Sequence, residues 1–332
     1  MAISFLSVVM PVFDADAYLG TAIESVQAQT FRHFELLIVD DGSQDRSVEV
    51  AEKYARGDER IRILRGEHGG VSKAMNRGLA ECRAEWVARM DADDVCERTR
   101  FEEQVEYLRR DPTPAALGTF GWRVSASGRI VGAYDEGPVS REEFERKRAA
   151  GKMIWLIQPS VVMRKRRVEE VGGYRDIQHE DLDIYQRLAD TDVILTLPKR
   201  LMRIRIGRGI TMSGLRTDER AIAYVRAATG ARRARRPEPS VEEFTRAYLG
   251  GLGAWQRVQQ YLRFVARYNY RRAGENLTER RWLSGLARMG LSLVSWPAVP
   301  VGRFRKQVLP LLREKTERLR LSVETRLFRR SP

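Results

Sequence analysis

The segment EWVARMDADDVCE, residues 85–97, passes within a few positions from an apolar run to a cluster of carboxylates. Residues 86–90 are mostly apolar, as in a buried strand, and the next four positions contain three aspartates: Asp91, Asp93 and Asp94. Arg89 is the one basic residue of the segment. Because carboxylates so close together repel one another, their position at the end of a strand calls for a positively charged partner.

The first 110 residues alternate between short apolar runs and stretches with helical spacing. The apolar runs are FLSVVM (5–10), FELLIV (34–39), IRIL (61–64) and WVARM (86–90). Apolar residues at helical spacing lie between these runs, within residues 17–28, 48–54 and 71–79. Ser43 or Asp45 is the expected N-cap of the second helix. This alternation implies right-handed crossovers and a parallel sheet with helices on both faces.

Two acidic clusters follow predicted strands, Asp40–Asp41 after residues 34–39 and the aspartates of 91–94 after 86–90. Ligands of parallel α/β sheets bind beyond the carboxyl ends of the strands. Two acidic clusters in one crevice need a cation or hydrogen-bond donors between them. Mg²⁺ takes one or two protein carboxylates and completes its shell with substrate phosphates, so the sequence predicts a metal–diphosphate site. Neither a P-loop nor a G-x-G-x-x-G motif follows the first predicted strand, which disfavours both of those nucleotide-binding folds.

Length and composition are those of a folded protein with one large domain or two ordinary ones. The chain has 332 residues, 43% of them hydrophobic, enough to build a core. Its two cysteines, Cys82 and Cys96, show neither metal-ligand spacing nor a disulfide framework, which fits a reducing compartment. The first residues lack the pattern of a signal peptide and are predicted to form a strand.

Charge is distributed unevenly along the chain. Residues 214–332 carry 26 Lys and Arg against 10 Asp and Glu, a net charge of +16, which leaves −2 for residues 1–213 out of the total of +14. Such asymmetry indicates a polyanion or an anionic membrane as the partner of the second part.

The second part contains three apolar patterns but no recognised motif. Residues 255–272 place Trp255, Val258, Leu262 and Val265 on one helical face, and residues 311–328 repeat leucine and valine at helical spacing. Residues 289–302 are uncharged but too short to span a bilayer. Two interpretations stay open for residues 214–332: a basic helical appendage packed on the first part, or a peripheral membrane anchor.

Three segments occur in an order that resembles family 2 inverting glycosyltransferases of the GT-A fold. They are LSVVMPVF…LLIVDDGSQDRS (6–47), HGGVSKAMNRGLAECRAEWVARMDADD (68–94) and GGYRDIQHEDLDIYQRL (172–188). The resemblance covers about residues 5–213 and depends on the order of the motifs rather than on any one of them. It implies an α/β GT-A nucleotide-diphospho-sugar transferase fold, with a mostly parallel sheet and flanking helices, over residues 1–213. Residues 1–110 would bind the nucleotide sugar, residues 111–213 the acceptor, and residues 214–332 would form the basic α-helical region.

The resemblance assigns the nucleotide side of the site to residues near the ends of the first two strands. Asp41 matches the aspartate that hydrogen-bonds the base, and a carboxylate that accepts from N3–H of uracil or thymine suits a UDP- or dTDP-sugar. Pro11, Val12 and Phe13 match a turn that lines the base pocket, with Asp14 where asparagine is commoner.

The resemblance also assigns the metal, the catalytic base and the acceptor side. Asp91 and Asp93 match the D-x-D motif, with Asp93 as direct ligand of Mg²⁺ or Mn²⁺ and Asp91 on the ribose or on a metal-bound water. Asp181 matches the general base. Further positions lie near the sugar diphosphate, Lys73 and Asn76, or border the acceptor, Gly172, Gly173 and Glu180.

One motif departs from the family pattern. Arg205 matches the arginine of a Tyr-Arg-x-His motif and is assigned to the donor, but Gly207 stands in place of the histidine. Whether Arg208 takes over the diphosphate contact stays open. The Q-x-x-R-W signature of processive synthases is missing from the sequence, so a single addition is expected.

We therefore expect an inverting, metal-dependent, hexosyltransferase-like enzyme that moves one sugar to a hydroxyl of a glycan or lipid-linked acceptor in cell-surface polysaccharide biosynthesis. It would be cytoplasmic and peripheral on the inner face of the cell membrane, with no nucleic-acid partner. The alternatives are a sugar nucleotidyltransferase-like enzyme and a non-catalytic protein that binds membranes or polyanions.

Each acidic motif also has a purely structural interpretation. The sequence DDGS alone could be a turn, Asp94 could belong to a helix N-cap, and HEDLD could be a solvated first turn of a helix. His68 and His179 are expected near the surface or behind the site rather than on a metal.

Overall fold

The computed structural model describes residues 5–206, 212–251, 253–278 and 281–301. These residues form two compact units. The first unit consists of residues 5–121, 135–204 and 217–251, and the second of residues 122–134, 205–206, 212–216, 253–278 and 281–301.

Four parallel strands form the first half of the sheet, in the order β3-β2-β1-β4. Their bounds are β1 Leu6–Val12, β2 Phe34–Asp40, β3 Ile61–Arg65 and β4 Trp86–Arg89. β2 is buried along its whole length, which its nearly continuous apolar sequence permits. The register pairs Leu6 with Phe34 and Val12 with Asp40, so the two strands end together and Asp40 and Asp41 lie at that edge.

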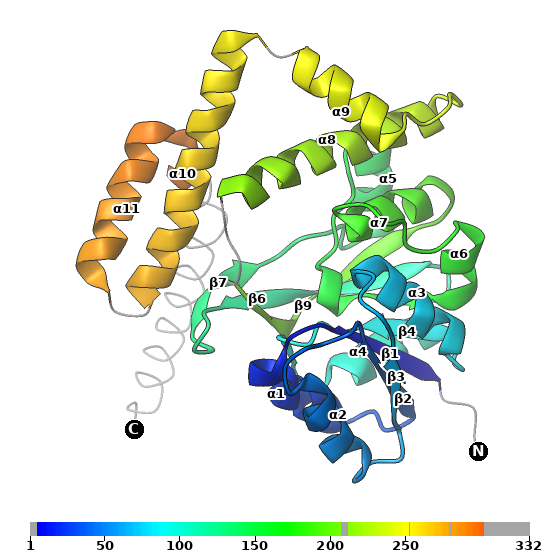
Figure 1. Cartoon of the computed structure of the whole chain (residues 1–332). Coiled ribbons are helices and arrows are strands. Elements are labelled where there is room, and N and C mark those ends of the chain that lie inside the picture. The colour runs from blue at the N-terminus through cyan, green and yellow to red at the C-terminus, as the bar shows by residue number, and fades with distance from the viewer. Residues whose placement is uncertain (1–4, 207–211, 252, 279–280, 302–332) are drawn as a thin grey trace, which may run out of the picture. The chain divides into compact units, whose positions relative to one another are not determined.

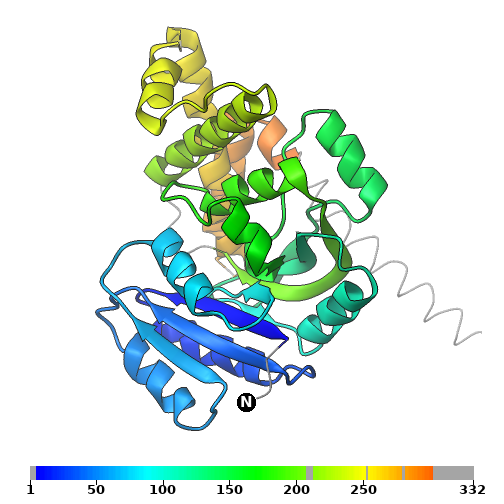
Figure 2. The same cartoon turned by 90° about the vertical axis from the view of Figure 1, so that its right-hand side faces the viewer.

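Three helices connect these strands as the sequence predicted: α1 Asp16–Gln27, α2 Ser47–Ala55 and α3 Val71–Glu81. Figure 2 shows α3 on one face of the sheet and α1 and α2 on the other, as right-handed crossovers require. The predicted N-cap of α2 is wrong, because the helix begins after Arg46. Asp45 instead accepts hydrogen bonds at 2.9 Å from the backbone N–H of Ser47 and from that of Asp16, which joins the start of α2 to the start of α1.

The rest of the sheet contains antiparallel strands and continues in the order β4-β8-β6-β9-β5, with β7 on β6. β8 is antiparallel to both β4 and β6, and β5 is antiparallel to β9. The bounds are β5 Val95–Cys96, β6 Ala116–Val124, β7 Ile130–Tyr134, β8 Val162–Arg164 and β9 Ile194–Arg205. The accompanying helices are α4 Arg100–Arg110, α5 Arg141–Ala149, α6 Lys165–Glu170 and α7 Glu180–Thr191, with a 3₁₀ turn at Gln158–Ser160.

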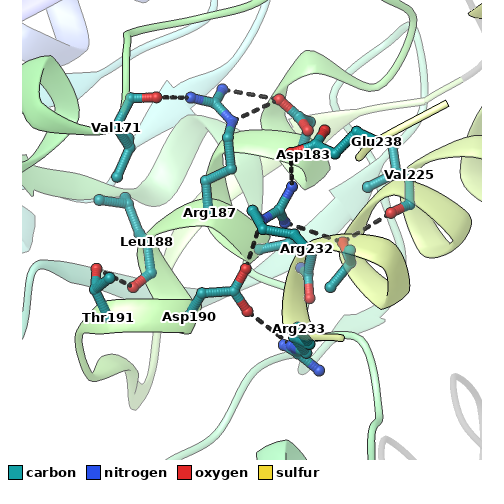
Figure 3. Close-up of polar contacts among 12 residues, drawn as sticks. Val171, Asp183, Arg187, Leu188, Asp190, Thr191, Val225, Arg232, Arg233 and Glu238 are labelled. Atoms are coloured by element: carbon teal, nitrogen blue, oxygen red, sulfur yellow. Dashed lines mark hydrogen bonds and ion pairs between the residues drawn. The ribbon is translucent and has the colours of Figure 1, made fainter. Parts of the chain in front are cut away.

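Helices α8 (Met212–Arg233) and α9 (Val241–Gly250) follow β9, and their residues from 217 to 250 belong to the first unit. Figure 3 shows how α8 is attached to α7: Arg232 and Arg233 each donate to Asp190, at 2.6 and 2.7 Å. Glu238, on the connection to α9, accepts from Arg232 at 2.9 Å and from Arg175 at 2.6 Å. Two arginines of the basic run at 231–236 are therefore paired within the unit. The functional boundary at residue 213 stays a prediction.

The second unit contains the helical hairpin of α10 (Ala254–Thr278) and α11 (Trp282–Ser295), which lie side by side in Figure 1. Ser292 of α11 donates to the carbonyl oxygen of Ala266 at 2.8 Å. Trp255 and Val258, on the predicted apolar face of α10, are exposed. Among the described helices, none is both long enough and apolar enough to cross a membrane. Residues 311–328 lie outside the described part of the chain.

Gly78 provides a test of how tightly α3 packs against the sheet. A Cβ atom at this position would lie 2.4 Å from Cγ1 of Val9 and 3.2 Å from Cγ2 of Val39, both on buried strands. We expect Gly78→Ala to destabilise the protein by about 1–3 kcal/mol through overpacking, despite the better helix propensity of alanine.

Gly230 in α8 is the matched control, because a Cβ atom there would meet nothing within 4 Å. Gly230→Ala should stabilise the protein by about 0.5–1 kcal/mol. Urea unfolding of both variants measures the two changes, and changes of the same sign would contradict this account of α3.

Candidate active site

A buried arginine joins two of the acidic motifs. Arg89, the last residue of β4, donates from Nε to Oδ1 of Asp91 at 3.0 Å and from Nη1 to Oε1 of Glu180 at 3.1 Å. Arg89 is 2% exposed and Glu180 is 7% exposed. The bridge therefore brings Asp91, at the end of β4, next to the start of α7, and it supplies a positive partner for this one member of the aspartate cluster.

Burial and charge act against each other in this bridge. Burial raises the pKa of Glu180, against the lowering effect of Arg89, and the neighbouring Asp181 raises it further. Burial would lower the pKa of Arg89, but the charge of Asp91 and other neighbours keeps it raised. Arg89 is therefore a permanent cation. The segment HEDLD is not a solvated turn, because the side chain of Glu180 is buried and pairs with Arg89. The Glu180 carboxylate also accepts a hydrogen bond from the side-chain amide of Gln158 at 2.9 Å.

Asp181 lies in the first turn of α7 and is partly exposed. Its carboxylate has no hydrogen-bond partner within the described residues. Burial raises the pKa of Tyr185, and the charges of both Asp181 and Asp91 raise it further. The Tyr185 hydroxyl is itself buried and lacks a hydrogen-bond partner in the described part of the chain. The charges of Asp181 and Asp91 therefore both raise the pKa of one hydroxyl group, although 90 positions separate the two aspartates in the sequence.

The glycine loop before α7 is held from two sides. Gly172 and Gly173 have φ angles of 85° and 67°, and a Cβ atom on Gly173 would lie 2.7 Å from Oδ1 of Asn76. The Asn76 amide donates to the carbonyl oxygen of Tyr174 at 2.7 Å and accepts from its N–H at 2.8 Å. Asn76, which the sequence analysis assigns to the donor side, therefore fixes this loop. Lys73, on the same helix, is exposed.

Arg187 of α7 holds the other side of the loop (Figure 3). It donates to the carbonyl oxygens of Val171 and Gly173, at 2.5 and 2.7 Å, and to Oδ2 of Asp183 at 2.8 Å. Asp183 is fully buried, so this second aspartate of HEDLD pairs with an arginine inside the protein. Asp183 is thus buried and paired with Arg187, whereas Asp181 is partly exposed.

The predicted base-binding residues gather at the ends of β1 and β2. Asp41 accepts hydrogen bonds from the backbone N–H groups of Gly69 and Gly70, at 3.0 and 2.8 Å, and its Oδ2 lies 3.0 Å from Nδ1 of His68. The His68 ring packs on that of Phe13, with 4.2 Å between their centroids. His68 is thus part of this group, although the sequence alone did not assign it to the donor side.

Pro11 and Val12 end β1, and the turn that follows has a strict backbone requirement at Asp14. The φ angle of Asp14 is 46°, a left-handed conformation that asparagine and aspartate tolerate better than other side chains. Its Oδ1 accepts a hydrogen bond from the backbone N–H of Gln44 at 2.8 Å. The side-chain oxygen of an asparagine could accept the same bond, so aspartate can take the place of asparagine in this turn.

Asp93 and Asp94 lie in a turn closed by the hydrogen bond from the Asp94 N–H to the carbonyl oxygen of Asp91, at 3.3 Å. The proposed helix N-cap at Asp94 is wrong, because the chain continues into β5. No group of three or more His, Cys, Asp and Glu residues in the described ranges could hold a metal. The oxygens of Asp91 and Asp93 suit a hard divalent cation only together with substrate oxygens, which is how Mg²⁺ is usually bound.

Arg205 belongs to the second unit. Its guanidinium donates to the carbonyl oxygens of Ser125 and Ala126, at 3.0 and 2.7 Å. The assignment of Arg205 to the donor stays a prediction, and Gly207 and Arg208 lie outside the described residues.

Arg89→Met tests how strongly the bridge stabilises the protein. The change leaves Glu180 buried without its cation, so we expect a loss of about 3–5 kcal/mol in the free energy of unfolding at pH 7. Without Arg89, the folded protein binds a proton at Glu180 more tightly than the unfolded chain does. The deficit should therefore shrink as the pH falls from 7 toward the ordinary glutamate pKa.

The control is Arg166→Met, which removes a pair between Glu170 and an arginine whose side chain is 83% exposed. That loss should stay within about 1 kcal/mol. Urea unfolding at several pH values measures both variants, and equal losses would contradict the importance of the Arg89 bridge.

Comparisons with known proteins identify the family of this chain and its fold. Residues 7–172 match the family model described as glycosyl transferase family 2. An uncharacterized glycosyltransferase of Haemophilus influenzae is 30% identical over 201 residues, which cover 58% of this chain and 72% of that protein.

Two solved structures are similar in fold. S. aureus TarS 1–349, in complex with UDP, gives a TM-score of 0.53 at 15% identity, covering 91% of both chains. The mannosyltransferase PcManGT from Pyrobaculum calidifontis, in complex with GDP-Man and Mn²⁺, gives 0.55 at 17% identity, covering 88% of this chain and 87% of that one. These similarities confirm the predicted GT-A fold. On the match of residues 7–172 and the identity with the H. influenzae protein, this chain belongs to glycosyl transferase family 2 and is a glycosyltransferase.

Proposed function

We propose that the protein transfers a single sugar, with inversion, from a UDP- or dTDP-sugar to a hydroxyl of a glycan or lipid-linked acceptor. We place this reaction in the synthesis of a cell-surface polysaccharide. The observation that carries the proposal is the Arg89 bridge, because it joins Asp91 of D-x-D to Glu180 beside the proposed base. Family membership favours this activity over the nucleotidyltransferase and the non-catalytic alternatives.

The surroundings of Asp41 support a pyrimidine donor. Within the described residues, Oδ1 of Asp41 accepts from Gly69 alone and so keeps a second lone pair, which suits the N3–H of uracil or thymine. The adjacent Phe13 and His68 rings offer a stacking surface. TarS was solved with UDP and PcManGT with GDP-Man, so proteins of this fold bind both kinds of base. We favour uracil or thymine for this chain because of Asp41.

Asp91 and Asp93 would hold Mg²⁺ or Mn²⁺ together with the diphosphate of the donor. When bound, the cation stabilises the negative charge that develops on the departing diphosphate. Arg89 orients Asp91 through its Oδ1. PcManGT was solved with Mn²⁺, in agreement with such a site.

Asp181 is the proposed general base. An acceptor hydroxyl attacks the anomeric carbon on the face opposite the diphosphate, and Asp181 takes the hydroxyl proton as the new bond forms. One displacement of this kind inverts the anomeric centre. The carboxylate is suited to the role because it is partly exposed and, among the described residues, makes no hydrogen bond that would occupy it.

We also propose that the protein is peripheral on the inner face of the cell membrane. The net charge of +16 in residues 214–332 supports attraction to anionic lipid. A lipid-linked acceptor is confined to that surface, so attachment would keep the enzyme near its acceptor.

Asp181→Asn tests the base, since asparagine keeps the shape but cannot take the proton. Turnover should fall by about 100- to 10,000-fold while donor affinity stays nearly unchanged. The control is Asp176→Asn, an exposed aspartate of the preceding loop, which should keep normal turnover. Release of UDP or dTDP measures turnover and calorimetry measures affinity. Loss of donor binding with normal turnover per bound donor would make Asp181 a binding residue.

Asp93→Ala tests the metal site. Removal of the proposed ligand should reduce transfer by on the order of 100-fold or more, because charge on the diphosphate is no longer stabilised. Binding of Mn²⁺ in the presence of UDP, followed by electron paramagnetic resonance, should weaken in parallel. Wild-type activity should vanish with EDTA and return with Mg²⁺ or Mn²⁺. An enzyme indifferent to EDTA would refute the metal assignment.

A further inference from the structure

Helix α11 exposes an apolar stripe. At 3.6 residues per turn, five large apolar side chains of α11 fall within an arc of about 120°, and each of them is exposed: Trp282, Leu283, Leu286, Leu293 and Val294. Leu291 is also exposed and widens the arc to about 180°. Leu283 and Val294 are 87% and 86% exposed. Apolar residues so arranged usually lie against a core, and a continuous exposed patch of them usually marks an interaction site.

The opposite face of α11 is small and polar, and it is the face that packs against α10. Gly285 is buried, and a Cβ atom there would lie 2.6 Å from Leu277. Ser292 is buried and donates to the Ala266 carbonyl oxygen, while Arg288 donates to Oδ1 of Asn269 at 3.2 Å. These contacts fix the rotation of α11 about its axis, so the apolar stripe is directed outward by the packing itself.

The net charge of the hairpin and of the residues after it indicates what covers the stripe. Residues 253–301 carry eight arginines and two glutamates, a net charge of +6, and residues 302–332 carry ten Lys and Arg against three Glu, a net charge of +7. A second copy of the chain, or residues 302–332 folded back, would therefore add positive charge to a surface that is already positive. An anionic lipid surface supplies both apolar volume and opposite charge.

We propose that the α11 stripe is the docking surface of this protein on an anionic bilayer. The helix lies in the plane of the membrane, with the five apolar side chains at the boundary between headgroups and acyl chains, and the arginines of the hairpin contact lipid phosphates. This inference rests on the proposed membrane location and assigns it to one face of one helix. It does not depend on the chemistry at Asp181.

The test uses the full chain and vesicles of phosphatidylcholine with or without phosphatidylglycerol. The double variant Leu283→Glu, Val294→Glu changes the two most exposed apolar positions of α11, which make little packing contact, so it should stay folded. The matched control is Ile130→Glu, Val139→Glu, which adds the same charge at exposed apolar positions outside the hairpin, 52% and 44% exposed. Flotation gives the bound fraction, and thermal unfolding checks the fold.

The wild type and the control should float with vesicles that contain phosphatidylglycerol, and the α11 variant should bind at least tenfold more weakly. Failure of the wild type to float, or equal flotation of the two double variants, would overturn the proposal. A third result would also overturn it: light scattering shows that the wild type is a dimer and the α11 variant a monomer, and the wild type does not bind vesicles. Release of UDP or dTDP in vesicle-free solution, measured for every variant, separates failure of this inference from failure of the proposed transferase.

Discussion

The buried positive charge of Arg89 is the constraint around which the site is organised. A guanidinium inside a protein is costly unless its charge and its N–H groups are matched by close partners, and the Glu180 carboxylate in turn is costly to bury without Arg89. Arg89 thereby ties the end of β4 to the start of α7. A second buried arginine, Arg100, donates to the backbone carbonyl oxygen of Arg89 at 3.0 Å and so fixes the end of β4. Burial lowers the pKa of Arg100 to about 10.

The same helix that carries the proposed base also shapes the loop beside it. On α7, Glu180 pairs with Arg89, while Asp183 and Arg187 fasten the glycine loop at 171–173. Asn76 of α3 holds the next residue of that loop, Tyr174. Movement of α7 would therefore disturb the carboxylates and the loop together, which is why this helix is the element that connects the two halves of the site.

The sequence predicts the first half of the fold well because each of its strands is a separate apolar run between helical stretches. It does not predict β5 or β8, since two- and three-residue strands are too short to show a period. It identifies the acidic motifs but not their connection. Arg89 differed from its neighbours only as the one basic residue of an apolar strand, and nothing local distinguished Asp181 from Asp183. Those differences depend on which partners the folded chain brings near.

The net charge of residues 214–332 illustrates a similar limit of sequence. The amount of charge is a property of composition, but its effect depends on where each arginine lies. Arg232 and Arg233 pair with Asp190, and Arg232 also pairs with Glu238, so two carboxylates within the first unit offset their charge locally. In the helical hairpin, acidic residues are few and the packing turns the apolar face of α11 outward. Positive charge and exposed apolar area thus coincide in the hairpin, and attraction to an anionic lipid surface requires both.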